Sequence, residues 1–375
     1  MLHFSCSLMA TIRVTSSSGP YTIYCGEGAL SRAASLIKRL GDSNGTFVLS
    51  SPNVWRHWGR TLAEIIPGAK RPILFDDRES AKRLDTVEGI ARALVRAGAD
   101  RRAVLVAVGG GVVGDVAGFA AATYLRGVRL VHIPTTVVAQ VDSAIGGKTG
   151  VDLPEGKNLV GAFYPPKLVI ADPAFLRTLP HREFGSGLYE VIKYGVIADQ
   201  KLFDFLEHRM DAILRRDAAA LAWIIPRSVA IKAHVVSADE REGGLRQILN
   251  FGHTLGHALE TATNYRRFLH GEAIGCGMIF STLLAVARGR LGDVHAMRII
   301  RLVASVGPLP AIGKIRAASL RPILASDKKT RAGRVGWVLP RRIGDAQWGI
   351  DVPWPTVART FAELPTIAAR AGLRS

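Results

Sequence analysis

Short apolar runs rich in β-branched residues alternate with amphipathic stretches through the first half of the chain. Between two of these runs, apolar residues recur at helical spacing from Leu84 to Val95. The runs have the length and composition of buried parallel strands, and they occupy residues 46–50, 72–75, 103–108, 130–133 and 168–171. Alternating strands and helices predict a doubly wound α/β domain.

The pattern changes near Thr178, and most of the second half has helical periodicity. The longest helical stretches are expected at residues 218–238, 247–262, 272–288 and 293–306. We therefore expect two domains, an α/β domain over 1–180 and a mainly α-helical domain over 181–375. A length of 375 residues agrees with two domains.

Composition excludes several classes of protein. None of the three cysteines forms a C-x-x-C pair, so a reducing cytoplasm is expected rather than a disulfide framework. No apolar run reaches the roughly 18–20 residues of a membrane span, and the first residues lack the features of a secretory signal. Met9 is a second candidate start.

The formal net charge is +18, which raises the question of a nucleic-acid partner. The basic residues are scattered singly or in pairs, and no dense basic tract carries interleaved aromatic residues. A field of this kind also attracts small anions. The charge therefore favours an anionic metabolite as ligand, without nucleic acid or membrane as partner.

A glycine-rich turn, Gly109-Gly110-Gly111-Val112-Val113-Gly114-Asp115, comes directly after the third expected strand. Consecutive glycines allow close approach of a phosphate to backbone N–H groups at the start of a helix. The spacing is not that of the usual dinucleotide fingerprint. Thr135 and Thr136 end the next strand, where they either cap a helix or bind a nucleotide.

Lysines stand beside glycines in the next segment of the chain. Asp142 begins a stretch that continues through Gly146-Gly147-Lys148-Thr149-Gly150, and Gly156-Lys157-Asn158 comes shortly after. This is not a P-loop, because Asp142 occupies the position of its first glycine. We expect Lys148 and Lys157 to capture a phosphate or carboxylate beside a flexible backbone, the alternative being a solvated surface loop.

Histidines concentrate in the second half. His253 and His257 are four residues apart on one expected helix face, His270 lies before another helix, and Glu190 lies one turn from Lys193. Two imidazoles and a carboxylate are a usual catalytic zinc set. The motif is not HExxH, which disfavours a metalloprotease. Spacing alone leaves open which two histidines bind the metal.

Charged and amide groups lead into the histidine helix. Arg246 and Asn250 are expected one turn apart on its face, with Lys232 and Glu242 before them. Lys328 and Lys329 come after an aspartate further along. Such a set would suit a substrate that carries a carboxylate or phosphate.

Taken together, these blocks resemble the 3-dehydroquinate synthase family over most of the chain, from about Arg78 to about Gly344. The carriers of the resemblance are GGGVVGDVAGFAAATYLRG (109–127), IPTTVVAQVDSAIGGKTGVDLPEGKNLVGAFY (133–164), GLYEVIKYG (187–195), DEREGGLRQILNFGHTLGHALE (239–260) and HGEA (270–273). The resemblance implies a Rossmann-like N-terminal domain, an α-helical C-terminal domain and an active site in the cleft between them. It also implies NAD, one zinc or cobalt ion, and a homodimer.

The resemblance assigns roles residue by residue. The implied metal ligands are Glu190, His253 and His270, with His257 a proton relay. The implied NAD contacts are Glu79, Lys82, Gly110, Gly111, Val112, Asp115, Thr135, Thr136, Lys148, Lys157, Phe175, Thr178 and Glu183. The implied substrate and catalytic residues are Asp142, Lys148, Asn158, Lys193, Lys232, Glu242, Arg246, Asn250, His257 and His270, one lysine of Lys328-Lys329, and Arg126 reaching the neighbouring subunit.

The implied reaction converts 3-deoxy-D-arabino-heptulosonate 7-phosphate to 3-dehydroquinate and phosphate, with NAD reduced and reoxidised in each turnover. Two positions depart from the family pattern. Ser51 stands where an acidic residue usually bonds the adenosine ribose, and Tyr189 precedes Glu190 where a small residue is commoner.

Three rival functions are kept open. A sister sugar phosphate cyclase shares fold and cofactors, but the lysine blocks with Lys232 and Arg246 favour a carboxylated substrate. A metal-dependent polyol dehydrogenase would release NADH. A nucleic-acid-binding protein would bind DNA tightly and salt-sensitively, without phosphate release.

Overall fold

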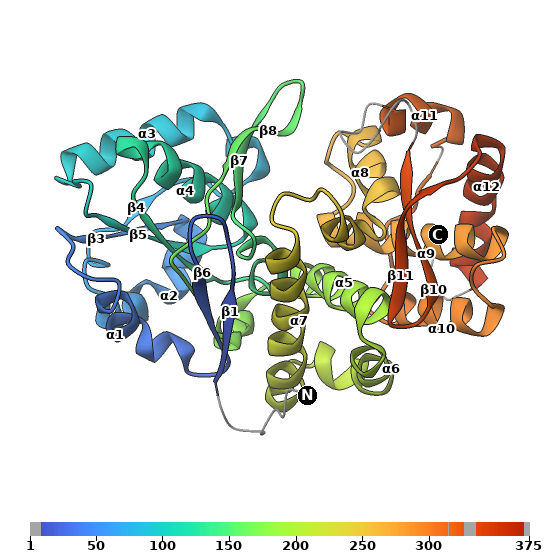
Figure 1. The fold of residues 1–375 in the computed structure, drawn as a ribbon, viewed down its shortest axis with the longest axis horizontal. Coiled ribbons are helices and arrows are strands. Elements are labelled where there is room, and N and C mark those ends of the chain that lie inside the picture. The colour runs from blue at the N-terminus through green and yellow to red at the C-terminus, as the bar shows by residue number, and fades with distance from the viewer. Residues whose placement is uncertain (1–8, 314, 326–334, 371–375) are drawn as a thin grey trace. The chain divides into compact units, whose positions relative to one another are not determined.

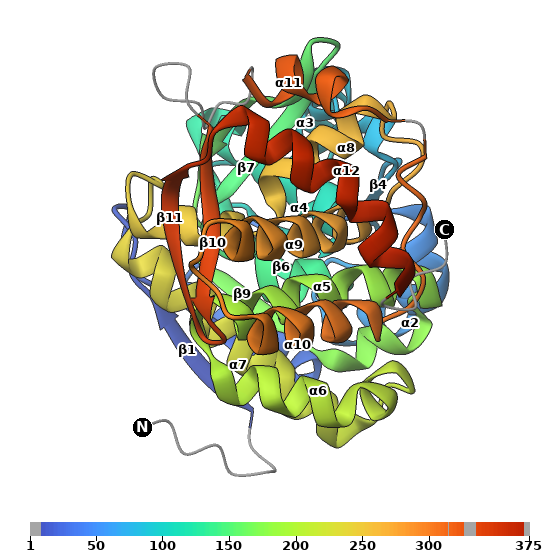
Figure 2. The same ribbon diagram turned by 90° about the vertical axis from the view of Figure 1, so that its right-hand side faces the viewer.

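The computed structural model describes residues 9–313, 315–325 and 335–370, with side chains as far as Leu364 (Figures 1 and 2). These residues divide into two compact units. Unit 1 consists of the described residues up to Leu179 and of Leu221–Glu240. Unit 2 consists of Pro180–Ala220 and of the described residues from Arg241 onward.

A single mixed sheet forms the centre of unit 1. Within the described part of the chain its seven strands run in the order β1-β2-β9-β6-β5-β3-β4. They are β1 (Ala10–Val14), β2 (Tyr21–Cys25), β3 (Thr46–Ser50), β4 (Ile73–Leu74), β5 (Val104–Gly109), β6 (Arg129–Pro134) and β9 (Leu168–Ala171). Only β1 and β2 pair antiparallel. The five predicted parallel strands are confirmed, whereas the β1–β2 pair was not predicted.

Helices cover both faces of this sheet, as the doubly wound pattern predicted (Figure 1). Val104, Val106 and Val108 of β5 join the core formed with α1 (Ala33–Lys38) and α2 (Pro52–Ile65). Leu105 and Ala107, which point the other way, join the core formed with α3 (Leu84–Arg96) and α4 (Gly111–Thr123). Apolar side chains on both faces explain the continuous apolar runs.

Two further elements belong to unit 1. The strands β7 (Lys148–Leu153) and β8 (Gly156–Phe163) form an antiparallel hairpin. Most of α7 (Ala218–Ala238) groups with unit 1, where Ser237 Oγ accepts from the backbone N of Thr15 at 3.0 Å. Lys232, which this helix carries, therefore lies in unit 1.

Unit 2 is mainly helical, as expected. Its helices are α5 (His181–Ala198), α6 (Gln200–Leu214), α8 (His253–Ala262), α9 (His270–Ala287), α10 (Asp293–Ala304), α11 (Ala317–Ala325) and α12 (Trp354–Arg370). A hairpin of β10 (Gly336–Arg342) and β11 (Asp345–Asp351) was not predicted. In Figure 2, α9 lies among α5, α10, α12 and β10, and its side chains are buried on almost every side, as expected of a core helix.

The predicted helix over 247–262 is confirmed from His253 onward but not before it, because the chain breaks ahead of the histidines. A 3-10 helix spans Leu245–Asn250, and Gly252 has a φ of 79° before α8 begins. A Cβ on Gly252 would lie 2.7 Å from the carbonyl oxygen of Ile274. The glycine therefore permits both the left-handed turn and the close approach of α8 to α9.

Among the described residues, two helices reach the length and hydropathy of a membrane span, although no apolar run of that length was expected from the sequence. They are α7 and α9, and most of each is buried within the protein. Burial of this kind is the usual property of a core helix.

Candidate active site

The glycine turn and the paired threonines lie side by side in unit 1. β5 ends at Gly109, whose carbonyl accepts from the backbone N of Thr135 at 2.9 Å. A Cβ on Gly110 would lie 3.1 Å from Thr136 Cγ2. β4 lies on one side of β3, whereas β5, β6 and β9 lie on its other side. The glycine turn therefore stands where the order of the strands reverses. Doubly wound sheets bind ligands at this point.

Thr136 also caps the turn that begins there, since its Oγ1 accepts from the backbone N of Ala139 at 3.1 Å. Capping of the following turn and binding of a nucleotide, the two roles that the sequence left open, are therefore compatible at Thr136. Val112, also predicted to contact NAD, is half-buried in the first turn of α4.

The buried Lys82 pairs with two other predicted NAD and substrate residues. Lys82 Nζ donates to Asp115 Oδ2 at 2.6 Å and to Asn158 Oδ1 at 2.5 Å. Burial raises the pKa of Asp115, and Lys82 offsets this only in part. Burial lowers the pKa of Lys82, but attraction to Asp115 and Glu79 outweighs it, so that this pKa is raised. The cluster links the chain before α3 to α4 and β8.

Two more lysines pair with predicted site carboxylates. Lys157 Nζ lies 2.7 Å from Glu79 Oε1, and the buried Lys232 Nζ donates to Asp142 Oδ1 at 2.7 Å. Lys148 is the first residue of β7, so the alternative of a surface loop does not apply to it. The left-handed turn at Gly146 and Gly147 precedes it and leads into the strand.

Phe175 and Thr178 lie against α2. Phe175 is fully buried, with its ring centroid 4.7 Å from that of Trp58, and Trp58 Nε1 donates to Thr178 Oγ1 at 2.8 Å. Ser51, one of the two departures from the family pattern, is buried and caps α2 by accepting from the backbone N of Val54 at 3.3 Å. The bond explains a capping residue at this position, but not serine in place of an acidic residue, because aspartate caps a helix equally well.

Three helices of unit 2 bring the candidate metal ligands together. Glu190 comes from α5, His253 from α8 and His270 from α9. Glu190 Oε1 lies 3.5 Å from Nε2 of each histidine. Both oxygens of Glu190 are buried and lack a well-oriented hydrogen bond among the described residues, although Lys193 Nζ pairs with Oε2.

This geometry fits a metal ion. Ligand atoms about 2.0–2.2 Å from a tetrahedral zinc lie roughly 3.4 Å from one another, close to the separations between Glu190 and the two imidazoles. His253 Nδ1 contacts the carbonyl oxygen of Phe251 at 3.1 Å, so that its Nε2 is left to face Glu190. A buried carboxylate with poorly satisfied oxygens between two such imidazoles is suited to zinc or cobalt.

The charges of this cluster are strongly coupled. Burial raises the pKa of Glu190, but Lys193 and His253 outweigh burial and hold it well below its usual range. Burial lowers the pKa of His253, and Glu190 opposes this only in part. Burial also lowers the pKa of His270, but Glu190 and Glu260 outweigh burial and raise it to about 10. Glu190 therefore stays ionised, as a ligand must.

His257 is the third histidine of the group. One ring nitrogen from each of His253, His257 and His270 lies within 4.8 Å of the others, so three imidazoles also form a possible metal set. The rings of His253 and His257 are 5.4 Å apart and meet edge-on. The two possible sets share His253 and His270 and differ in whether Glu190 or His257 completes them.

The remaining predicted residues of unit 2 lie mostly in the segment before α8. Asn250 Nδ2 donates to Glu242 Oε1 at 2.6 Å, and Arg246 is buried. Because Leu245–Asn250 is a 3-10 helix, the prediction that Arg246 and Asn250 share one α-helical face is wrong. Glu183 is exposed on the first turn of α5. Lys328 and Lys329 lie outside the described residues.

Left-handed backbone recurs at predicted site residues that are not glycine. Arg126, Asn158 and Glu242 have φ values of 66°, 53° and 61°. Such conformations cost about 1–3 kcal/mol each and persist where surrounding contacts enforce them, often at functional sites. Arg126 is also exposed, as a residue that reaches another subunit must be.

Sequence reasoning missed two carboxylates beside the histidines. Glu260 Oε2 lies 3.4 Å from His270 Nδ1. Glu272 accepts two bonds from Arg182 at 2.7 and 2.8 Å, and a third from the backbone N of Leu269 at 2.8 Å. The signal for Glu260 was its place one turn after His257, and that for Glu272 was its place two residues after His270.

Tyr189, the second departure, packs away from the histidines. A Cβ on Gly275 of α9 would lie 2.9 Å from Tyr189 Cε1, so the ring fills the space that this glycine leaves. The large side chain is therefore part of the contact between α5 and α9.

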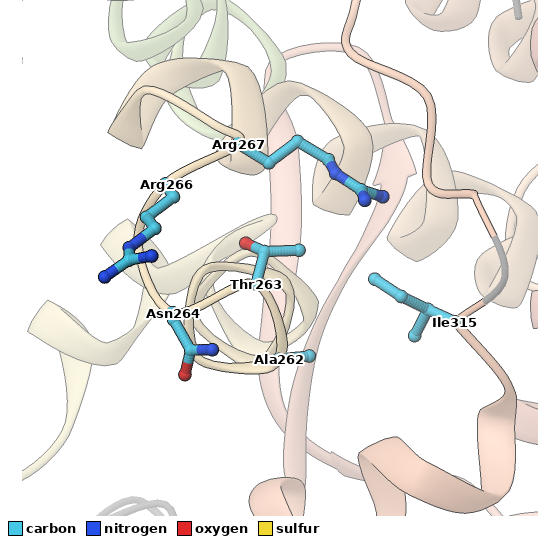
Figure 3. Close-up of a pocket in the computed structure, with 6 residues that line it drawn as sticks. All are labelled: Ala262, Thr263, Asn264, Arg266, Arg267 and Ile315. Atoms are coloured by element: carbon cyan, nitrogen blue, oxygen red, sulfur yellow. The ribbon is translucent and has the colours of Figure 1, made fainter.

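A hollow beside the end of α8 contains none of the predicted site residues. It is lined by Ala262, Thr263, Asn264, Arg266, Arg267 and Ile315. Figure 3 shows the guanidinium groups of Arg266 and Arg267 pointing in different directions. Arg267 Nη1 donates to the carbonyl oxygen of Ile312 at 3.1 Å, which holds the chain after α10. The hollow is thus separate from the metal cluster.

Solved structures of sugar phosphate cyclases are similar to this chain. A 2-epi-5-epi-valiolone synthase from Streptomyces hygroscopicus subsp. jinggangensis, with NAD⁺ and Zn²⁺ bound, is 31% identical, with a TM-score of 0.84 over 92% of this chain and 97% of the other. A 2-deoxy-scyllo-inosose synthase complexed with carbaglucose-6-phosphate, NAD⁺ and Co²⁺ is 27% identical, with a TM-score of 0.80 over 94% and 99%.

The sequence comparisons identify the family. The 3-dehydroquinate synthase N-terminal model matches residues 72–186, and the C-terminal model matches residues 187–330. The 3-dehydroquinate synthase of Koribacter versatilis is 45% identical over 95% of this chain and 98% of its own length. That of Solibacter usitatus is 47% identical over 82% and 87%. With these similarities and with the glycine turn, buried lysines and histidine cluster in place, the chain belongs to the 3-dehydroquinate synthase family.

Proposed function

We propose that the chain converts 3-deoxy-D-arabino-heptulosonate 7-phosphate to 3-dehydroquinate and phosphate, a step of the shikimate pathway that leads to aromatic amino acids. The similarity to curated 3-dehydroquinate synthases over nearly the whole chain carries this proposal. The buried Glu190 between His253 and His270 supports it, because this donor set suits the divalent metal that such chemistry uses.

NAD and one zinc or cobalt ion are the proposed cofactors. NAD would bind in unit 1 at the glycine turn, beside Thr135 and Thr136 and the Lys82–Asp115 pair. Glu190, His253 and His270 would hold the metal. When bound, the metal polarises a substrate oxygen and stabilises the negative charge that develops on it. NAD would be reduced and reoxidised within each turnover, so no net NADH is formed.

The chain's own cations would bind the anionic groups of the substrate. In unit 1, Lys148 and Asn158 would hold the phosphate, and Lys232, oriented by Asp142, would bind a hydroxyl or the carboxylate. In unit 2, Lys193 and Arg246 would bind the same kinds of group from buried positions. Few solvent molecules compete at buried cations, which strengthens the attraction and fixes the orientation of the substrate.

Proton transfer would fall to His257 and Asn250. Asn250 is oriented by its bond to Glu242, and would hold a water molecule near the reacting centre. An imidazole ordinarily gains and loses its proton near neutrality, which suits His257 to take and return protons during turnover. In this assignment His257 stays off the metal.

The proposed assembly is a homodimer in the cytoplasm. Arg126 would reach the phosphate in the neighbouring subunit, to which its exposed position and left-handed backbone are suited. The two long apolar helices are mostly buried, as expected of core helices rather than membrane spans.

The direct test is incubation of the purified chain with the heptulosonate phosphate, NAD⁺ and zinc. We expect release of phosphate together with 3-dehydroquinate, and no accumulation of NADH. Accumulation of NADH without phosphate release would indicate a polyol dehydrogenase instead. Turnover of sedoheptulose 7-phosphate or glucose 6-phosphate, but not of the heptulosonate, would indicate a sister cyclase.

A further inference from the structure

The two imidazoles that face Glu190 through Nε2 each have a hydrogen-bond acceptor at the other ring nitrogen, Nδ1. His253 has Nε2 at 3.5 Å from Glu190 Oε1, and Nδ1 at 3.1 Å from the carbonyl oxygen of Phe251. His270 has Nε2 at 3.5 Å from the same oxygen, and Nδ1 at 3.4 Å from Glu260 Oε2. In each ring an acceptor therefore stands at Nδ1 and the candidate metal position at Nε2.

Glu260 is buried, and the turn that follows α8 fixes its backbone. It lies in the last turn of α8 and is only 4% exposed. Its carbonyl oxygen accepts from the backbone N of Tyr265 at 2.8 Å and so closes the turn that leads toward α9. Asn264 and Tyr265 take left-handed φ values of 50° and 56° in that turn. The backbone that carries the carboxylate is thus held in place, and the carboxylate lies buried beside His270.

An acceptor at Nδ1 decides which imidazole nitrogen can bind a metal. A neutral imidazole carries one proton, and an acceptor at Nδ1 keeps the proton there, which leaves the Nε2 lone pair free. A carboxylate in this position also fixes the ring plane and makes Nε2 a stronger donor to the metal than a carbonyl does.

We propose that Glu260 is a positioning residue that holds His270 with its Nε2 lone pair directed at the metal. This inference rests on the proposed function, because it takes His270 as a ligand. Glu260 does not itself bind the ion. The two histidines are then unequal: His253 is oriented by a neutral carbonyl, and His270 by a buried charge.

The test compares metal binding in the wild-type chain, Glu260→Gln and Glu260→Asp. Zinc affinity is measured by competition with a chelator, and the ligand field is measured by the visible absorption of the cobalt-substituted protein. We expect Glu260→Gln to weaken zinc binding by about 10–100-fold and to shift the cobalt bands. Glu260→Asp keeps the charge with a shorter reach, so its affinity should lie between the two.

Glu272→Gln is the matched control. It also removes a buried negative charge next to His270, but Glu272 bonds Arg182 and the start of α9 rather than an imidazole. We expect this variant to lower the melting temperature of the metal-free protein. Its zinc affinity should stay within about threefold of wild type, well short of the loss that removal of a ligand-orienting group causes.

Wild-type zinc affinity and unchanged cobalt bands in Glu260→Gln would overturn the inference. Equal losses of affinity in Glu260→Gln and Glu272→Gln would also overturn it, since they would show a general effect of packing. If Glu260→Gln does not fold, a zinc affinity of Glu260→Asp equal to that of the wild type would also overturn the inference. If the wild-type chain binds no metal, this result would instead refute the metal site that the proposed function requires.

Discussion

His257 separates two chemical assignments within one cluster of side chains. It lies close enough to His253 and His270 to be a third imidazole ligand, while Glu190 lies between the same two rings. We expect His257→Ala to keep one equivalent of zinc but to lower kcat by about 10²–10⁴-fold, because it removes a proton relay. Metal content by atomic emission and kcat by phosphate release check this.

His270→Ala is the companion to that variant. It should lose the zinc itself, and activity should not return at zinc concentrations that saturate the wild type. Loss of zinc from His257→Ala would assign the metal to the three imidazoles and would refute the relay.

His132 predicts a dependence of stability on pH that is independent of the metal. It is buried in β6, and burial lowers its pKa to about 4. In the unfolded chain the pKa is about 6.5, so the unfolded state takes up a proton first as the pH falls. Stability is therefore unaffected above pH 6.5 and decreases below it, by about 2 kcal/mol at pH 5.

Urea unfolding of metal-free protein at pH 7.5 and pH 5 measures this effect. In His132→Gln the decrease between the two pH values should be smaller by about the same 2 kcal/mol, whatever its stability at pH 7.5. An identical decrease in both proteins would show that another group is responsible.

At the scale of residues, the sequence predicted the side chains with unusual chemistry, but it did not predict the residues that orient these side chains. Glu190, His253, His257 and His270 stood out because imidazoles and carboxylates among small residues are unusual, and the family resemblance then selected Glu190, His253 and His270 as the implied ligands. Glu260 did not, since a glutamate near a helix end is ordinarily exposed. Its burial beside His270 depends on how α8 meets α9, which no local pattern encodes.

Two helices meet at a glycine that has no room for a side chain. A Cβ on Gly271, next to His270, would lie 1.8 Å from the carbonyl oxygen of Ser186 in α5. We expect Gly271→Ala to destabilise unit 2 by about 3 kcal/mol or more, because the backbones must separate. It should also weaken zinc binding, since Glu190 and His270 lie on the two helices.

Gly292→Ala is the control for this prediction. A Cβ on Gly292 would have nothing within 4 Å, and this glycine belongs to the same unit. Because Gly292 is the N-cap of α10, where alanine is less favourable than glycine, this variant should lose at most about 1 kcal/mol and should keep the zinc stoichiometry of wild type. A Gly271→Ala protein with an equally small loss and the same zinc stoichiometry would show that α5 and α9 can move apart at little cost.

The Lys82 cluster allows a comparable test in unit 1. Removing the ammonium by Lys82→Met leaves the half-buried Asp115 without its cation, which should cost about 2–3 kcal/mol, less than for a fully buried pair. The double variant Lys82→Met, Asp115→Leu should recover part of this, because neither charge is then buried alone. Urea unfolding checks both.

Lys157→Met provides the contrast. Its pair with Glu79 is more exposed, so the expected cost is at most about 1 kcal/mol. Equal costs for the two lysines would show that burial does not decide the strength of these pairs.

At the scale of elements, the sequence predicted structure wherever local pattern and burial agree. β3 and β9 have the predicted bounds because they are apolar on both faces. The hairpin of β10 and β11 carries arginine, aspartate and glycine, so its pairing depends on a long-range partner rather than on apolar periodicity. The break before α8 depends on Gly252 contacting α9, which a helical pattern cannot reveal.

The whole molecule is proposed to be a homodimer in which Arg126 serves the neighbouring site. Arg126→Ala and His270→Ala homodimers should both be nearly inactive. Mixed and allowed to exchange subunits, they should regain roughly a quarter of wild-type activity, because half of the dimers are mixed and one of their two sites is intact. Phosphate release after mixing measures this, and no recovery would assign Arg126 to its own subunit.

The net charge of +18 is a property of the whole molecule and carries no information about its fold. Among the lysines and arginines that matter for the proposed reaction, Lys193, Lys232 and Arg246 are buried, whereas Lys148 and Arg126 are exposed. Composition could not distinguish the three buried cations from the many exposed ones, because burial is a property of the folded chain.

The candidate ligands come from three helices, of which α5 lies far from α8 and α9 along the chain. An ion held by Glu190, His253 and His270 would bind the native protein and not the unfolded chain. It would therefore stabilise the packing of α5, α8 and α9 against one another. At a thousandfold excess over its dissociation constant, such an ion adds about 4 kcal/mol to stability. The temperature at which the protein melts would then rank zinc, cobalt and other ions by their fit to this site, without any measurement of turnover.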